Sequence, residues 1–167
     1  LAPNSISIST GLWDNDQITI GGKADSYYEY LIKQYFLTNR TELKYRRYFY
    51  KSVESILGQM LQYSNETKTA YIAQRFGRPG GFRLHRTFDH LACFFPGTLA
   101  LAAQELIKDG DDDLGEQWMR VAADLTETCY KMYARQRTGL SPESIEFPEN
   151  SEFINGDSFY LLRPEAM

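Results

Sequence analysis

The chain has 167 residues, 43% of them hydrophobic and 14% aromatic, which is enough apolar material for one domain with its own core and excludes a disordered protein. The formal net charge of -4 argues against a nucleic-acid partner, because affinity for nucleic acid rests mainly on clustered positive charge. The aromatic residues are mostly tyrosine and phenylalanine, which suit both a helical core and a sugar-binding surface.

Neither a membrane-spanning run nor a targeting signal is evident in the sequence. We see no apolar stretch long enough to cross a bilayer, and residues 1–11 lack the charged and then apolar plan of a signal peptide. The chain has no initial methionine and stops soon after an apolar stretch, so we expect both ends to be cut from a longer sequence. Any targeting signal or membrane anchor would then lie outside this chain.

Two amphipathic helices are predicted in the first part of the chain. The first opens at Ser26, which can form a capping box with Glu29, and its apolar stripe follows helical spacing. The stripe consists of Tyr28, Leu31, Ile32, Tyr35 and Phe36. The second runs from about residue 41 to residue 63, and its apolar face consists of Phe49, Val53, Ile56, Leu57, Met60 and Leu61. The short turn between them predicts a helical hairpin.

The pattern changes between residues 69 and 85, where a glycine-rich run at 77–81 separates two short apolar segments and predicts an extended excursion around a turn. A third helix is predicted from about Pro96, because the first helical position does not need an N–H donor. A fourth follows the acidic turn at 111–113, and an extended segment is expected at 159–163. Two helical hairpins with long loops suggest a ring of paired helices.

Ionisable residues gather where the apolar pattern breaks. Asp25 lies at a predicted helix start, where the helix dipole favours the carboxylate form, so it suits a general base better than an acid. Taken singly, each candidate has a simpler interpretation. Asp25 could be a helix cap, Glu165 a partner of Arg163 in a surface ion pair, His90 a core histidine, and Glu143 a turn residue.

Four segments together resemble the signatures of the class I α-1,2-mannosidases, glycoside hydrolase family 47. They read Gly-Gly-Lys-Ala-Asp-Ser-Tyr-Tyr-Glu-Tyr-Leu (21–31), His-Leu-Ala-Cys-Phe-Phe-Pro-Gly-Thr-Leu-Ala-Leu (90–101), Thr-Gly-Leu-Ser-Pro-Glu (138–143) and Leu-Arg-Pro-Glu (162–165). Their order and spacing make the resemblance highly specific. It covers the whole of residues 1–167, which would form a single partial catalytic domain, the middle to late third of such an enzyme.

The resemblance implies an all-α fold, part of an (α/α)7 barrel with short β-hairpin excursions in its loops. It also implies an inverting, calcium-assisted glycoside hydrolase that removes terminal α-1,2-linked mannose from high-mannose N-glycans. By position, Asp25 and Glu165 match two of the three catalytic carboxylates of the family, and we expect Glu165 to be the base. His90, Glu143 and Arg163 match residues that line the pocket for the terminal mannose.

The resemblance also bears on the cellular compartment. Cys93 and Cys129 match a pair that forms a disulfide in the endoplasmic-reticulum and Golgi enzymes; the alternative, two unpaired buried thiols, would fit a cytosolic protein. Asn39 and Asn65 begin Asn-x-Thr sequons, at predicted helix ends where a glycan would be accessible. We therefore expect the lumen of the endoplasmic reticulum or Golgi, or secretion.

Some parts of the family pattern fall outside this chain. The glutamate that acts as general acid lies upstream in the family and the calcium-binding threonine lies downstream, so no metal ligand is expected here and the chain alone should be inactive. Lys23 and the terminal residues Ala166 and Met167 depart from the usual pattern. In the family, loops at the open end select the glycan branch, so the resemblance implies that Arg83 or Arg86 of the excursion at 69–86 contacts outer mannose residues.

A second function stays open. Mannosidase-like proteins of glycoprotein quality control and degradation act chiefly by binding glycans, and the present chain could belong to that group. The stretch around His90 separates the two functions, because that group typically lacks the cysteine that this chain has at position 93. The presence of Cys93 therefore favours the processing enzyme.

Overall fold

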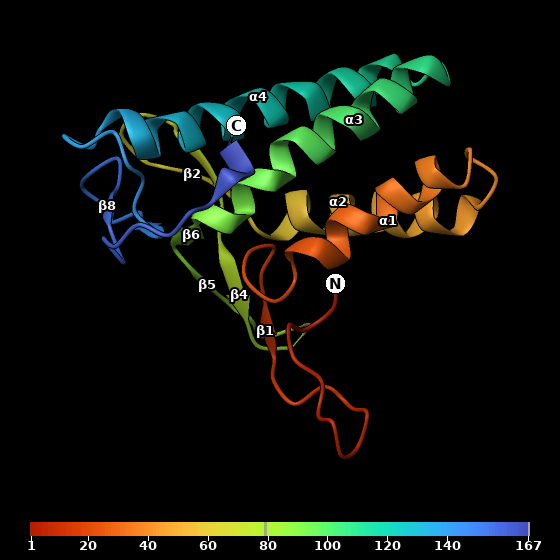
Figure 1. Cartoon of the computed structure of the whole chain (residues 1–167), viewed down its shortest axis with the longest axis horizontal. Helices are drawn as coiled ribbons and strands as arrows, with labels where there is room; N and C mark the ends of the chain where they lie inside the picture. The colour runs from red at the N-terminus through yellow and green to blue at the C-terminus, as the bar shows by residue number, and fades with distance from the viewer. Residues whose placement is uncertain (79, 167) are drawn as a thin grey trace.

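The computed structural model of the protein describes residues 1–78 and 80–166, and within them the chain forms four α-helices in two pairs. Helix α1 (Asp25–Leu37) packs along α2 (Leu43–Gln59), and α3 (Phe94–Lys108) packs along α4 (Asp112–Ala134), as Figure 1 shows. The chain also has two short 3₁₀ helices, η1 (His90–Cys93) and η2 (Pro164–Ala166). They contact each other, so the C-terminal segment lies against η1. The two helical hairpins expected from the periodicity are therefore confirmed.

Short antiparallel strands lie before, between and after the helix pairs along the chain. Strands β1 (Gln17–Ile18), β4 (Gln74–Phe76) and β5 (Arg83–His85) form one sheet in the order β1-β4-β5. Strands β2 (Leu61–Tyr63) and β3 (Ala70–Ile72) form a second sheet, and β6 (Thr87–Asp89), β7 (Ser144–Glu146) and β8 (Ile154–Asn155) form a third. The expected excursion after residue 69 is thus a set of short strands, which accompany a mainly helical fold.

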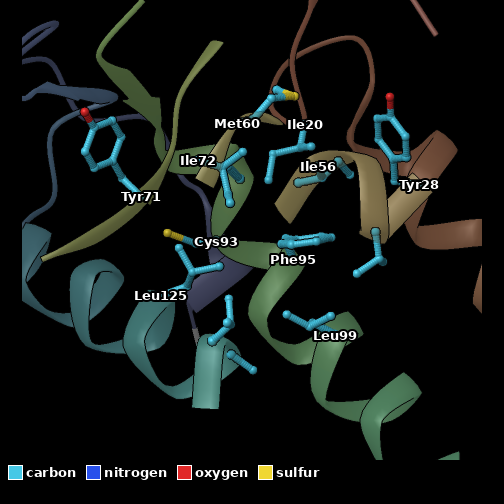
Figure 2. Packing of buried hydrophobic residues seen from close by; sticks show 14 of the residues in the cluster. Ile20, Tyr28, Ile56, Met60, Tyr71, Ile72, Cys93, Phe95, Leu99 and Leu125 are labelled. Carbon is cyan, nitrogen blue, oxygen red and sulfur yellow. The ribbon is translucent and has the colours of Figure 1, made fainter. Parts of the chain in front are cut away.

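One apolar core joins the two helix pairs. Figure 2 shows Phe95 and Leu99 of α3 pointing into the same interior as Leu125 of α4 and Ile56 of α2. Each of these four side chains is fully buried. Burying such a side chain contributes about 1.5–3 kcal/mol, so these contacts fix how the helices are placed under the loops that carry the polar motifs.

Several predicted boundaries were wrong. Helix α1 begins at Asp25 and has no side-chain cap, so Ser26 lies inside the first turn and forms no capping box; its backbone N–H instead donates to Asp25 Oδ1 at 2.8 Å. Helix α2 ends at Gln59 because residues 61–63 pair with β3. Helix α3 begins two residues before Pro96, which its first turn tolerates because those N–H groups have no partner within the helix.

The extended segment expected at 159–163 belongs to no strand, and residues 159–163 have no regular secondary structure. Among the described residues one segment, His90–Lys108, is long and apolar enough to cross a membrane by length and composition, with a mean hydropathy of 1.2. The prediction that no apolar stretch is long enough to cross a bilayer was therefore wrong for this segment, by length and composition. Since 61% of that window is buried in the protein, the segment also fits an ordinary core helix.

Both sequon asparagines are exposed. Asn39 follows the C-terminus of α1 with a positive φ of 48°, and Asn65 lies in the turn between β2 and β3. Close to the first sequon, Arg40 forms a two-pronged ion pair with the buried Glu105 of α3, with N–O distances of 2.8 and 2.9 Å. This ion pair connects the turn of the first helix hairpin, between α1 and α2, to helix α3 of the second hairpin.

Candidate active site

A cavity of about 430 Å³ lies where the start of α1, the start of α3 and η2 meet. It is lined by Asp25, Ser26, Glu29, Lys33, Leu91, Phe94, Gly97, Thr98, Leu101, Pro164 and Glu165. The two carboxylates singled out in the sequence, Asp25 and Glu165, therefore share one cavity although 140 residues separate them along the chain. Asp25 is anchored there by the backbone N–H of Ser26.

Arg163 and Glu143 form a forked ion pair beside this cavity. The Arg163 Nε donates to both carboxylate oxygens of Glu143 at 3.1 Å, and its Nη2 donates to Oε1 at 2.5 Å. The neighbouring Glu143 carboxylate raises the pKa of Arg163, so the guanidinium stays charged. A forked arginine pair has a fixed geometry, and it can present the remaining guanidinium and carboxylate positions to the hydroxyl groups of a ligand.

His90 is buried between this ion pair and Glu165. Its backbone N–H donates to the carbonyl of Glu143 at 2.9 Å, and its ring Nε2 lies 2.6 Å from the hydroxyl of Tyr133 on α4. The other ring nitrogen, Nδ1, lies 3.6 Å from Glu165 Oε2. Burial lowers the pKa of His90, while the neighbouring Glu165 and Glu143 carboxylates oppose that shift.

The structure therefore brings together the five polar residues singled out in the sequence. Asp25 and Glu165 line the cavity, His90 contacts Glu165, and Arg163 and Glu143 form the ion pair next to them. Such a group of two carboxylates, an imidazole and a guanidinium can orient a water molecule, remove a proton from it and hold sugar hydroxyls.

Tyr133 was missed in the sequence, and Asp89, which directly precedes the motif of His90, was given no role there. Tyr133 lies near the end of α4, where its hydroxyl is 2.6 Å from His90 Nε2 and 3.3 Å from the carbonyl oxygen of Arg163. Asp89 directly precedes His90 and accepts from Gln74 Nε2 at 3.1 and 3.2 Å, and burial raises its pKa. The sequence signal for Tyr133 was its place one helical turn after Cys129.

Gly21 leaves the space that Asp89 occupies. A Cβ atom at Gly21 would lie 2.5 Å from Asp89 Oδ2 and 3.0 Å from Asp89 Cβ. Asp89 cannot easily move away, because its backbone belongs to β6 and pairs with Ser144 of β7. The glycine at position 21 is thus required for the close approach of the chain that leads into α1.

We expect Gly21→Ala to lower the free energy of unfolding by about 1–3 kcal/mol, because the added methyl group overpacks the contact with Asp89. Denaturant titration measures this change. The matched control is Gly58→Ala in α2, where a Cβ meets nothing within 4 Å and where alanine favours the helix by roughly 0.5–1 kcal/mol. Equal stability of Gly21→Ala and the unaltered protein would contradict the contact.

A disulfide joins Cys93, at the end of η1, to Cys129 on α4. The structure thus contains the bond that the family resemblance implies. His90 lies three residues before Cys93, and Tyr133 lies four residues after Cys129. The bond therefore holds the two segments together next to the contact between His90 and Tyr133.

The two arginines suggested for outer mannose contacts lie away from the cavity. Arg83 is exposed on β5, and Arg86 is exposed beside the phenol of Tyr71. Burial raises the pKa of Tyr71, and the charge of Arg86 opposes part of this shift. Neither lines the cavity that holds Asp25 and Glu165. Their contact with outer sugars stays a hypothesis. Lys23 is exposed and has a positive φ of 73° directly before the helix start.

Residues 1–167 match the sequence model of Glycosyl hydrolase family 47 over their whole length. The chain belongs to this family. The match covers all four segments that carry the polar residues, so the resemblance seen in the sequence is confirmed.

Relatives in family 47 include the human mannosyl-oligosaccharide 1,2-alpha-mannosidase IC, which is 35% identical over 170 residues that cover 100% of this chain and 26% of that protein. The human endoplasmic reticulum mannosyl-oligosaccharide 1,2-alpha-mannosidase is 34% identical over 100% of this chain and 24% of that protein. The fold is similar to that of an alpha-1,2-mannosidase from Trichoderma reesei, with a TM-score of 0.81, 20% identity, and coverage of 96% of this chain and 35% of that chain. This chain thus spans about a quarter of the length of its curated relatives.

Proposed function

We propose that this chain is part of a glycoside hydrolase that removes terminal α-1,2-linked mannose from high-mannose N-glycans. The observation that carries the proposal is the shared cavity of Asp25 and Glu165, with His90 against Glu165. Membership of family 47 and the names of the relatives, which are mannosyl-oligosaccharide 1,2-alpha-mannosidases, support the substrate class.

Glu165 is our proposed general base. It lies between the cavity and His90, so a water molecule in the cavity could give its proton to the carboxylate as the water attacks the sugar. An inverting glycosidase needs this base on one face of the sugar and a carboxylic acid on the other, with about 6.5–9.5 Å between the two groups. The acid would come from outside the chain, and Asp25 would help to orient the water or the sugar.

Arg163, Glu143 and His90 are proposed to bind the terminal mannose. The forked pair of Arg163 and Glu143 offers a cation and a carboxylate at fixed positions, which suits the vicinal hydroxyl groups of a pyranose. The backbone carbonyl of Glu143 also accepts a hydrogen bond from the backbone N–H of His90. The three residues would therefore move as one unit.

Calcium is proposed as an assisting ion that helps to orient the sugar and the water. Within residues 1–78 and 80–166, no group of three or more His, Cys, Asp or Glu side chains could hold a metal ion. The ligand threonine would lie beyond this chain. We assign no step of the reaction to the ion.

We propose that the two helix pairs are part of an (α/α)7 barrel in the complete domain. Large hydrophobic side chains are exposed on all four helices, among them Leu37, Leu43, Leu101 and Tyr130. Neighbouring helix pairs of a barrel would cover them. The disulfide and the two exposed sequons support a location in the lumen of the endoplasmic reticulum or Golgi, or secretion.

The decisive experiment incubates the complete catalytic domain with a high-mannose oligosaccharide and follows the anomeric proton of the released mannose by NMR. We expect release of α-1,2-linked mannose first as the β-anomer, which is the inverted product, and loss of activity with a calcium chelator. Binding of the oligosaccharide without release of mannose would instead support the glycan-binding alternative. The isolated 167-residue chain should release no mannose, because the proposed acid would come from outside it.

A further inference from the structure

Tyr133 is at the centre of a short chain of polar contacts that ends at Glu165. Its hydroxyl lies 2.6 Å from His90 Nε2 and 3.3 Å from the carbonyl oxygen of Arg163. On the other side of the imidazole, His90 Nδ1 lies 3.6 Å from Glu165 Oε2. Within the described residues, both Nδ1 and Oε2 are buried and have no hydrogen-bond partner.

The unpartnered atoms indicate where the proton of the imidazole belongs. A buried polar atom without a partner is destabilising, and Nδ1 and Oε2 face each other. A proton on Nδ1 lets it donate to the Glu165 carboxylate and satisfies both atoms. A bare Nδ1 would instead place two acceptors against each other.

Tyr133 permits this arrangement in either charge state of the histidine. When His90 is neutral, the Tyr133 hydroxyl donates to Nε2, so the single ring proton lies on Nδ1. When His90 is charged, its Nε2–H donates a hydrogen bond to the Tyr133 oxygen. The Tyr133 hydroxyl then donates its own hydrogen bond to the carbonyl of Arg163. The hydroxyl can donate and accept, and phenylalanine can do neither.

We propose that Tyr133 is a positioning residue that holds His90 with an Nδ1–H directed at Glu165, and so keeps the Glu165 carboxylate ionised and oriented as the base. The inference rests on the proposed hydrolase function for its effect on activity. Its structural part, the position of the ring proton, is independent of that function. Tyr133 itself does not line the cavity that holds Asp25.

Several other charged and titratable groups lie around His90, Tyr133 and Glu165. They are Glu143, Arg163, Tyr160 and, across the cavity, Asp25, Glu29 and Lys33. Glu143 and Arg163 neutralise each other in their ion pair, and Lys33 forms an ion pair with Glu29. An Nδ1–H of His90 directed at Glu165 would therefore act on a carboxylate whose charged neighbours are largely paired.

The test is Tyr133→Phe in the complete catalytic domain. A hydrogen bond from Nδ1–H would stabilise the charged carboxylate relative to the neutral acid, and the variant should lose this stabilisation. We expect the acid limb of the kcat/KM profile to move up by roughly half to one pH unit and kcat to fall about tenfold, with KM little changed. Tyr130→Phe is the matched control, because this tyrosine lies on the same helix but is 65% exposed.

A second measurement keeps the proposal testable if the domain proves inactive or the variant unfolds. ¹⁵N NMR of the histidine ring in the unaltered protein should show a proton on Nδ1 of His90 throughout the range in which the imidazole is neutral. A neutral His90 with its proton on Nε2 would overturn the proposal. So would an active Tyr133→Phe variant with an unshifted pH profile. Absence of mannosidase activity, with the proton on Nδ1, would refute only the proposed function.

Discussion

Glu165→Gln should lower kcat of the complete catalytic domain by about 10²–10⁴-fold, the usual contribution of general acid–base catalysis. Glutamine has nearly the shape of glutamate but cannot take a proton from water. Because Glu165 lines the cavity and faces His90 without carrying the forked ion pair, the variant should keep its affinity for the oligosaccharide. Steady-state kinetics gives kcat, and titration calorimetry with the oligosaccharide gives the affinity.

The matched control is Glu127→Gln on α4. Glu127 is exposed and forms an ion pair with Lys131, one helical turn further along the same helix. This variant should keep kcat within twofold, because exposed pairs contribute little. A fall of less than tenfold for Glu165→Gln would mean that another carboxylate is the base. If Asp25→Asn then showed the larger loss, the roles of the two carboxylates in the cavity would be exchanged.

The helices could be predicted because their apolar periodicity reflects the core that they share. Tyr28, Leu31, Ile32 and Tyr35 were placed on the buried face of α1, and the structure buries all of them. Boundaries depend on weaker, local competition. The end of α2 was placed too late because Leu61 continues the helical stripe, while its backbone pairs with Ile72 across the β2–β3 turn. That pairing is a tertiary effect that a stripe cannot reveal.

The site shows the same division. His90, Glu143, Arg163 and Glu165 lie in short motifs at the ends of elements, where polar residues interrupt the apolar pattern, so sequence alone could single them out. Tyr133 lies near the end of α4 and outside these motifs, so the motifs did not point to its polar role. Only the fold shows that its hydroxyl reaches Nε2 of the histidine.

Cys93→Ala/Cys129→Ala should lower the free energy of unfolding by roughly 4 kcal/mol, the loop-entropy value for the 36-residue separation of these cysteines. The bond also holds η1 against α4 within a turn of both His90 and Tyr133. Its removal should therefore loosen the contact between the two rings, and the acid limb of the activity profile should move in the same direction as in Tyr133→Phe. Denaturant titration and the pH profile measure the two effects.

Reduction separates the effect of the bond from the effect of the two altered side chains. With a strong thiol reductant, the unaltered protein should lose about as much stability as the double variant has lost, while the double variant should not respond. If the reductant leaves the unaltered protein unchanged although its thiols become accessible to a labelling reagent, the bond does not stabilise the fold. If reduction lowers stability but leaves the pH profile of activity unchanged, the contact between His90 and Tyr133 survives without the disulfide. The bond would then stabilise the fold without positioning His90.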